Sequence, residues 1–198
     1  MTAENKFGKI SEVRLETELR DVFFTAPFKV MLPFYLREDY MQVMILSASA
    51  GIMEGDVQKF DIHVNPGTSL EYLSQAYEKI HKMKEGMARR ETKIVVEPEA
   101  FLKYAPLPTI PFKDSAFENH LEIELKEKTS RLLFQEILSC GRAACGETFA
   151  YRFYHNHVAV REEGNLIYLD NTRYDPEFFE MSGMGMYEEF THLLNLVF

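Results

Sequence analysis

Two acidic side chains stand where the surrounding sequence limits what a carboxylate can do. Asp56 ends the turn Glu54-Gly55-Asp56, directly after an apolar stretch, and Glu136 lies inside the apolar run 132–138. A carboxylate among apolar residues is unfavourable unless it is paired with a cation or faces a hydrated passage. The pattern therefore predicts either a buried ion pair or a functional acidic site at Glu136.

A third carboxylate, Glu147, follows Gly146, and Arg142 follows Gly141 in the same short stretch. Arg142 is placed to neutralise Glu136 or Glu147, which is the purely structural interpretation. Two embedded carboxylates could instead perform the acid/base chemistry of a glycosidase. That alternative, an all-β hydrolase using Glu136 and Glu147, lacks the aromatic platform that sugars need, and the chain has no Trp.

The fragment Tyr154-His155-Asn156-His157 has the most metal-like spacing in the chain, because residues i and i+2 of a strand share one face. Two imidazoles still need a third ligand for a zinc-type site, so we interpret them as half-buried strand histidines. Cys140 and Cys145 are predicted to be reduced thiols. Together with His192 they could bind a soft metal, but their spacing does not require it.

Several function classes are excluded or disfavoured. The chain has neither a GxxxxGK[ST] loop nor a GxGxxG fingerprint, and no GxSxG or HExxH motif. The net charge of −9 disfavours nucleic-acid binding, although a local basic patch at 79–90 exists, and it suits a cation or a basic partner. No run approaches the ~20 apolar residues of a membrane span, and the first residues lack a signal-peptide pattern. We expect a cytoplasmic protein with no nucleic-acid or membrane partner.

The elements that position these residues are mainly strands. Apolar and polar residues alternate with period two over 13–20, 60–64, 93–96, 121–126 and 149–154. Short helices are predicted at two places, within 75–85 and after the N-cap-like Asp175-Pro176-Glu177. The predicted fold class is mainly β, with stacked antiparallel or mixed sheets and one or two short helices.

Three segments resemble one another and predict a repeated strand-turn-strand unit. Residues 62–72 align with 94–104, including a Pro in the turn and a final Tyr, and residues 123–133 form a weaker third copy. A period near thirty residues predicts stacked β units, in which each unit covers the apolar face of its neighbour.

Several segments in this order resemble the urease accessory protein UreD family, called UreH in some bacteria. The first two segments are 49–56, with Gly55, and 74–80, with Lys79. The third is Ile110-Pro111-Phe112, and the fourth is the run Glu136-Ile137-Leu138, Gly141-Arg142 and Gly146-Glu147-Thr148-Phe149. The resemblance covers essentially the whole chain. It implies that Gly55, Lys79, Pro111, Phe112, Gly141, Arg142 and Gly146 are structural or partner-binding positions.

The resemblance implies a non-enzymatic maturation factor. Such a protein would bind apo-urease and the accessory protein UreF, and through UreF the GTPase UreG, and would help to deliver nickel. Asp56, Glu136 and Glu147 are then candidates for a nickel passage, with Ni²⁺ bound transiently and no tightly bound cofactor. An adaptor that never contacts nickel is the alternative.

The family also implies a longer β scaffold than this chain contains. We expect residues 1–198 to form one β domain of the UreD/UreH type that stops short of the family's C-terminal segment. The apolar run 192–198 is predicted to be an edge strand.

Overall fold

The computed structural model describes residues 8–17 and 22–198, and these residues form two β-sheets. Sheet A runs in the order β15 (Asn165–Tyr174), β14 (Phe153–Glu162), β12 (Ala116–Leu125), β9 (Ala88–Val96), β6 (Val57–Val64), β1 (Ile10–Glu16) and β2 (Val22–Phe24). Sheet B runs in the order β3 (Phe28–Val30), β5 (Tyr40–Ser47), β7 (Ser69–Ser74), β10 (Phe101–Tyr104), β13 (Arg131–Ser139), β11 (Thr109–Pro111) and β8 (Glu78–Ile80). In sheet B, β4 (Phe34–Arg37) also pairs with β5, and β16 (His192–Val197) pairs with β13.

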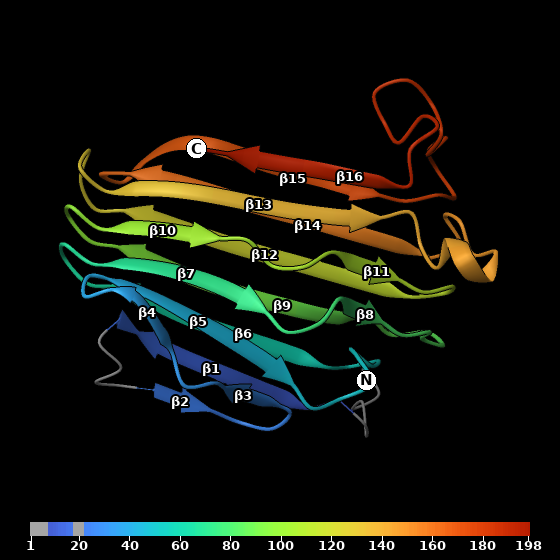
Figure 1. The fold of residues 1–198 in the computed structure, drawn as a ribbon. Helices are drawn as coiled ribbons and strands as arrows, with labels where there is room; N and C mark the ends of the chain where they lie inside the picture. Colours follow the sequence, from blue (N-terminus) through green and yellow to red (C-terminus); the bar gives the residue numbers. More distant parts are fainter. Residues whose placement is uncertain (1–7, 18–21) are drawn as a thin grey trace, which may run out of the picture.

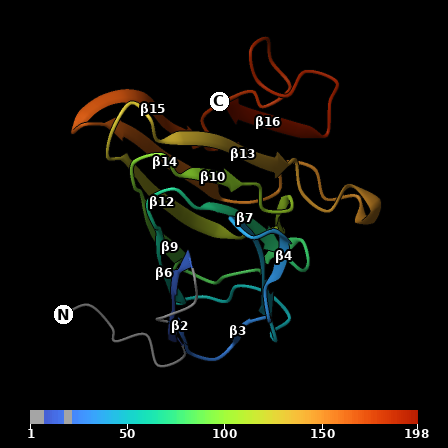
Figure 2. The ribbon, with the colours of Figure 1, turned by 60° about the vertical axis from the view of Figure 1, so that its left-hand side comes forward.

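The predicted repeat is confirmed as a stack of strand-turn-strand units (Figure 1). Each unit gives one strand to each sheet, namely β6 and β7, β9 and β10, and β12 and β13, and the strands of successive units pair in parallel. Ile62 is paired with Ile94, and Ile94 with Ile123. Figure 2 shows the two sheets face to face, joined by the turns.

The corners explain why the first two copies match so well. In Asn65-Pro66-Gly67-Thr68, Gly67 has φ +68° and the Thr68 N–H donates to the Asn65 carbonyl at 3.2 Å, as expected for the predicted type II turn. The third alignment was wrong by one residue in its second half. Tyr104 is paired with Phe134 rather than Leu133, because the third corner contains one residue more.

The core lies between the sheets and is built from the inward residues of the period-two pattern. Tyr72 and Tyr104, equivalent in the repeat, stack at 4.6 Å between ring centroids, and Phe134 continues the stack at 6.3 Å. Facing them from sheet A are buried Ile62 and Ile94. Burying such a side chain stabilises a fold by roughly 1.5–3 kcal/mol, so the stacking of units supplies the core that one unit alone lacks.

Both predicted helix positions were wrong. Within 75–85 the chain forms β8, which pairs in parallel with β11, and buried Ile80 packs into the core. This stretch has no apolar stripe of helical period, so strand pairing prevails. After Asp175, one turn closes when the N–H groups of Phe178 and Phe179 donate to the Asp175 carbonyl, and no helix follows. Within the described residues, the one complete helical element is the short 3₁₀ helix η2 (Ala143–Cys145).

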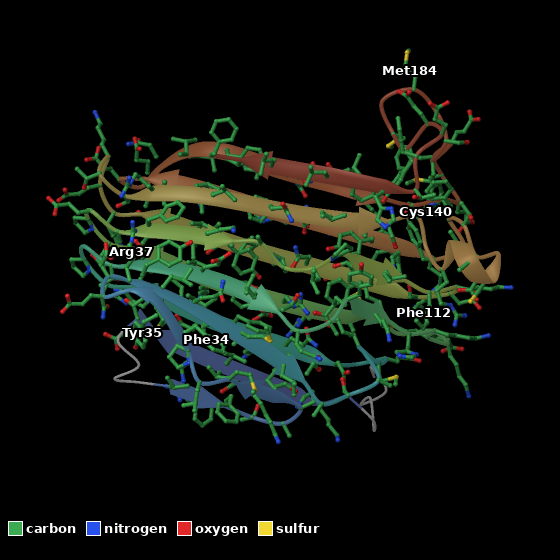
Figure 3. The ribbon with its side chains drawn as sticks, in the orientation of Figure 1. Phe34, Tyr35, Arg37, Phe112, Cys140 and Met184 are labelled. Atoms are coloured by element: carbon green, nitrogen blue, oxygen red, sulfur yellow. The ribbon has the colours of Figure 1, made fainter. Side chains whose placement is uncertain are left out.

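The apolar run at 192–198 is a strand, as predicted. β16 pairs antiparallel with β13, and Leu194 and Leu196 are exposed. The Pro-rich stretch after Pro27 forms β3 and β4, and Figure 3 shows Phe34, Tyr35 and Arg37 on or beside β4. None of the described residues belongs to a helix long and apolar enough to cross a membrane.

Candidate functional site

A row of polar side chains crosses the inner face of sheet A, where the period-two pattern otherwise places apolar residues. Strand pairing puts its six members next to one another in the order Ser11, Gln58, Arg90, Asn119, Asn156 and Thr172. We call these six residues the polar row. Since polar groups are retained in a core only when they have partners, the contacts of this row define the candidate site.

The middle of the row is an ion pair between the two sheets. The Arg90 Nη2 donates to the Glu78 carboxylate of β8 at 2.5 Å, and the Arg90 Nε donates to Gln58 Oε1 at 2.9 Å. Burial opposes the charge on Arg90, but Glu78, Tyr104 and Tyr72 together outweigh burial and raise the pKa of Arg90. The guanidinium also lies 5.3 Å from the centre of the Phe60 ring. This part of the interior is therefore charged but electrically balanced.

Further along the row, Glu136 of β13 faces sheet A. Asn156 donates to Glu136 Oε2 at 2.6 Å, and Asn119 donates to Glu136 Oε1 at 3.1 Å. Asn156 Nδ2 also donates to Asp170 Oδ2 at 2.8 Å, which brings a second carboxylate to the same amide. Burial, followed by the charge of Asp170, raises the pKa of Glu136 to about 7 despite these hydrogen bonds. Asn195 of β16 donates to Asp170 at 3.3 Å.

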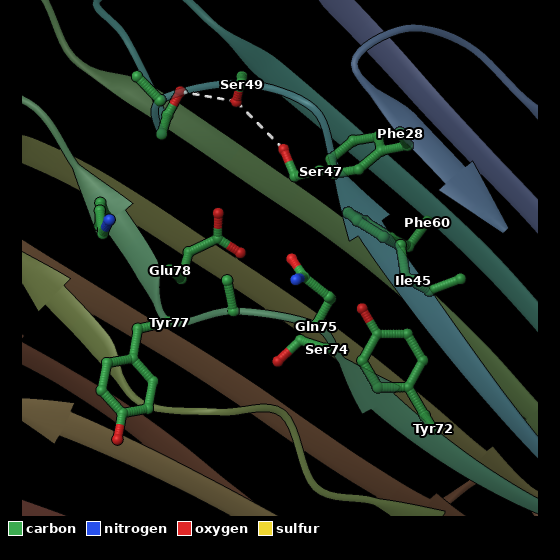
Figure 4. A pocket seen from close by; sticks show the side chains of 14 residues that line it. Phe28, Ile45, Ser47, Ser49, Phe60, Tyr72, Ser74, Gln75, Tyr77 and Glu78 are labelled. Carbon is green, nitrogen blue, oxygen red and sulfur yellow. Dashed lines mark hydrogen bonds between the residues drawn. The ribbon is translucent and has the colours of Figure 1, made fainter. Parts of the chain in front are cut away.

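Three cavities follow one another along this interior. The first, about 540 Å³, is lined by Asp56 together with Ser11 and Gln58 of the polar row. It shares Phe28, Ser49 and Gly51 with a second cavity of about 80 Å³, drawn in Figure 4, where Tyr72 and Glu78 line the wall. The third, about 30 Å³, shares Tyr72 and Glu78 with the second and contains Arg90 and Glu136. The last cavity has room for a water molecule and none for a sugar, which disfavours the glycosidase alternative.

Asp56 lies in the turn before β6, as predicted, and its carboxylate is held by backbone. Asp56 Oδ2 accepts from the Met53 N–H at 2.8 Å, and Oδ1 accepts from the Lys9 N–H at 3.2 Å. Gly55 has φ +81°, which lets the turn close. Lys79 is exposed on β8, and its carbonyl accepts from the Ile52 N–H at 2.7 Å. The two hydrogen bonds to its carboxylate give Asp56 a fixed position in the wall of the largest of the three cavities.

Arg142 pairs with Glu147 and not with Glu136. Its Nε donates to Glu147 Oε2 at 2.8 Å, its Nη2 to Glu147 Oε1, and its guanidinium lies 4.1 Å from the centre of the Phe112 ring. Arg142, followed by the Lys113 N–H, lowers the pKa of Glu147. Of the two pairings that the sequence allowed, this one is confirmed, but as a partly exposed pair rather than a buried one. Figure 3 shows Phe112 beyond the end of β11.

Glycines fix the backbone beside this pair. Gly141 has φ +131°, and a Cβ there would come within 2.6 Å of the Glu147 carbonyl oxygen. Gly146 has φ +74° and ends η2, with open space around its Cα. Pro111 is buried at the end of β11, paired with Ile80. Gly141 and Gly146 therefore set the backbone path beside the Arg142–Glu147 pair, and a part of these positions in partner binding stays a prediction.

The three candidate carboxylates do not gather at one point. Asp56 lines one cavity, Glu136 lines another between the two sheets, and Glu147 lies in a partly exposed ion pair. Within the described residues, no three His, Cys, Asp or Glu side chains converge as they stand to hold a metal ion. Cys140 is buried, Cys145 is exposed, and both thiols are free, as predicted.

Sequence reasoning missed most of the partners of Glu136. Asn119, Asn156 and Asp170 stand on three different strands, 17, 20 and 34 residues away in the sequence. The available signal was their position in the alternation, since each takes an inward position next to apolar residues such as Leu121 and Val158. A polar residue at an inward position of successive repeats indicates an internal polar row.

Comparison with known proteins agrees with the resemblance seen in the sequence. The family model described as "UreD urease accessory protein" matches residues 7–198. The chain is 39% identical over 201 residues to a protein of Helicobacter pylori (strain HPAG1) named urease accessory protein UreH, covering 98% of this chain and 76% of that protein.

Two further relatives come from other bacteria, and both are named urease accessory protein UreD. The protein of Acetivibrio thermocellus is 40% identical over 203 residues, with 98% of this chain and 77% of that protein covered. The protein of Lachnoclostridium phytofermentans is 30% identical over 198 residues, with 100% and 69% covered. The chain therefore belongs to the UreD family of urease accessory proteins.

Proposed function

We propose that this chain acts in urease maturation as a non-enzymatic scaffold that binds apo-urease and the accessory protein UreF, contacts UreG through UreF, and helps to deliver nickel to the urease site. Family membership supports the role in urease maturation. The names of the relatives describe accessory proteins, which favours a non-enzymatic role. We place this role in the cytoplasm, where free thiols such as Cys140 and Cys145 stay reduced.

The observation that carries the nickel part is the continuity between Asp56 and Glu136. Asp56 lines a cavity that also exposes two members of the polar row, and the row continues to Glu136, Asn156 and Asp170. Nickel prefers imidazole or thiolate ligands to isolated carboxylates, so oxygen donors of this kind bind it weakly. Weak binding suits a cargo that must be released.

Glu136 has the properties that a transient ligand needs. With a pKa of about 7 it exchanges its proton close to neutral pH, and a cation that displaces the proton is released again when the proton returns. Glu147 remains a candidate, but its pairing with Arg142 gives it less freedom to bind a cation. The proposed path therefore places Asp56 at the entrance and Glu136 inside.

A reconstituted urease activation assay with copurification tests this proposal. Triple replacement of Asp56, Glu136 and Glu147 by Ala is expected to reduce activation while the variant still copurifies with urease subunits and UreF. Glu136→Gln, which preserves shape, is expected to account for much of the loss. Replacement of Asp61, which is exposed and faces outward on β6, by Asn is the control. Unchanged activation by the triple variant refutes the passage and leaves the adaptor alternative.

Equilibrium dialysis separates the remaining possibilities. The passage requires nickel uptake that falls in the Glu136→Gln variant, whereas a pure adaptor shows no carboxylate-dependent uptake. The hydrolase alternative would require a substrate turnover that the same substitution abolishes.

A further inference from the structure

Two histidines meet on the outer face of sheet A, the side opposite the polar row. His120 of β12 is paired in register with His157 of β14, and their rings stack with centroids 4.4 Å apart and planes 9° apart. The sequence had singled out His155 and His157 but offered no third imidazole. The third imidazole is that of His120, 37 residues before His157 in the chain, and the parallel pairing of β12 with β14 places it beside His157.

Carboxylates surround His120 on this face. Glu122, two residues along the same strand, places Oε1 3.2 Å from His120 Nε2. Glu91 of β9 is paired in register with His120, and Glu118 is paired with His155. The side chains of His120 and Glu122 are 48% and 44% exposed, so both can reach a ligand from solvent. A hollow of about 400 Å³ borders His120 and is lined by Glu91, Glu118 and Glu122, and also by Arg89, Arg90 and Lys93.

The imidazoles are disposed to act as ligands. The Nδ1 atom of His157 is buried and makes no hydrogen bond. His155 accepts or donates one hydrogen bond, to Asn171 Oδ1 at 2.9 Å, which leaves its second nitrogen for other contacts.

We propose that His120 and His157, together with Glu122, form a surface site for a borderline divalent transition metal such as Ni²⁺ or Zn²⁺. Imidazole and carboxylate are suitable ligands for such ions. The stacked rings do not converge on one point in the structure, so binding requires rotation about the side-chain torsions of His120 and Glu122, which are exposed and therefore rotate fast. His155 lies beside them as a further ligand. The site is separated from the interior by sheet A and does not depend on the proposed nickel passage.

The test is titration calorimetry of the purified chain with NiCl₂ and, separately, ZnCl₂ at neutral pH. We expect saturable binding by the wild type. The His120→Ala variant is expected to bind roughly tenfold more weakly or worse, because removing even a second-shell partner costs metal sites about 10- to 100-fold. The His120→Ala/His157→Ala double variant is expected to lose this binding.

Two control variants locate the metal. His63→Ala removes an imidazole from the same outer face that pairs instead with Glu97, and Glu136→Gln alters the interior. Both are expected to keep the outer site, and circular dichroism checks that every variant is folded. The proposal is overturned if the wild type shows no saturable binding, if the double variant binds like the wild type, or if Glu136→Gln abolishes the binding.

Discussion

Asn156 donates one hydrogen bond of 2.6 Å to Glu136 and so links the inner face of sheet A to that of sheet B. The same amide nitrogen donates to Asp170 at 2.8 Å, so that two carboxylates share one donor. Burial is the main cause that opposes ionisation of Glu136, and the like charge of Asp170 adds to the effect. Together they keep Glu136 near its midpoint of protonation at neutral pH.

The first prediction concerns the pH dependence of stability at Glu136. The pKa of Glu136 rises from 4.5 to about 7 on folding, so the folded state favours the protonated carboxyl. The stability that this preference gives the chain is fully present below pH 4.5 and is lost as the pH rises through 7. Glu136→Gln removes the ionisation, and its stability relative to the wild type should increase between pH 5 and pH 8. The gain is of the order of 3 kcal/mol at most, from about 1.4 kcal/mol per pKa unit. Urea denaturation at both pH values measures it, and a difference that does not vary with pH contradicts the burial of this carboxylate.

Glu54 should show the opposite sign. Its carboxylate accepts from the N–H groups of Lys84 at 2.8 Å and Gly86 at 2.6 Å, and these backbone bonds lower its pKa below 4.5. The stabilisation is therefore present above pH 4.5 and is lost as the pH falls through the lowered pKa. Glu54→Gln should destabilise the chain at pH 7 and should do so less at pH 4. Thermal unfolding at the two pH values is the measurement, and a larger loss at pH 4 would argue against the backbone cradle.

Features of this structure that depend on residues close together in the sequence could be predicted, and features that depend on contacts between distant residues could not. Strands with alternating apolar residues and the corner Asn65-Pro66-Gly67 depend on neighbours in sequence, and most of them were predicted correctly. The strand predicted over 149–154 was wrong in its first part, because Phe149 has φ +51° and β14 begins only at Phe153. Of the predicted stretch 13–20, residues 18–20 lie outside the described residues. The repeat predicted that Tyr72 and Tyr104 are equivalent positions of stacked units, and the structure stacks their rings. The helix expected within 75–85 failed because pairing with β11, a tertiary contact, determines the conformation there.

The candidate site was harder to predict because it depends on register. The unusual position of Glu136 in an apolar run was visible, but its partners lie on other strands. Arg90 appeared in the sequence as one charge of a basic patch, whereas the structure places it inside, paired with Glu78. A shift of one residue in strand register moves a side chain to the other face of the sheet. The corner of the third repeat is one residue longer than the others, so an alignment of the repeats misplaces the strand that contains Glu136 by one residue.

The two glycines beside the Arg142–Glu147 pair should respond differently to Ala. Gly146→Ala requires only a left-handed backbone in open space and should cost about 1–2 kcal/mol. Gly141→Ala adds a Cβ within 2.6 Å of the Glu147 carbonyl oxygen and should cost distinctly more. Denaturation midpoints of the two variants give the comparison. Equal losses would mean that the close approach at Gly141 is relieved without strain.

The last prediction concerns the ion pair that joins the two sheets in the middle of the polar row. The side chains of Arg90 and Glu78 are 13% and 22% exposed, so each charge depends on the other. Arg90→Met leaves Glu78 without its cation and should destabilise the chain by about 3–5 kcal/mol, whereas replacing Arg90 by Met and Glu78 by Leu together should cost much less than the sum of the single changes. The exposed pair Arg37–Asp39, with side chains 67% and 57% exposed, is the matched control, and Arg37→Ala should cost no more than about 1 kcal/mol. Urea denaturation of the four members of the double-mutant cycle measures the coupling. If the two single losses simply add, Arg90 and Glu78 do not neutralise each other in the interior, and the proposed passage would then present an unbalanced positive charge to any cation that enters it.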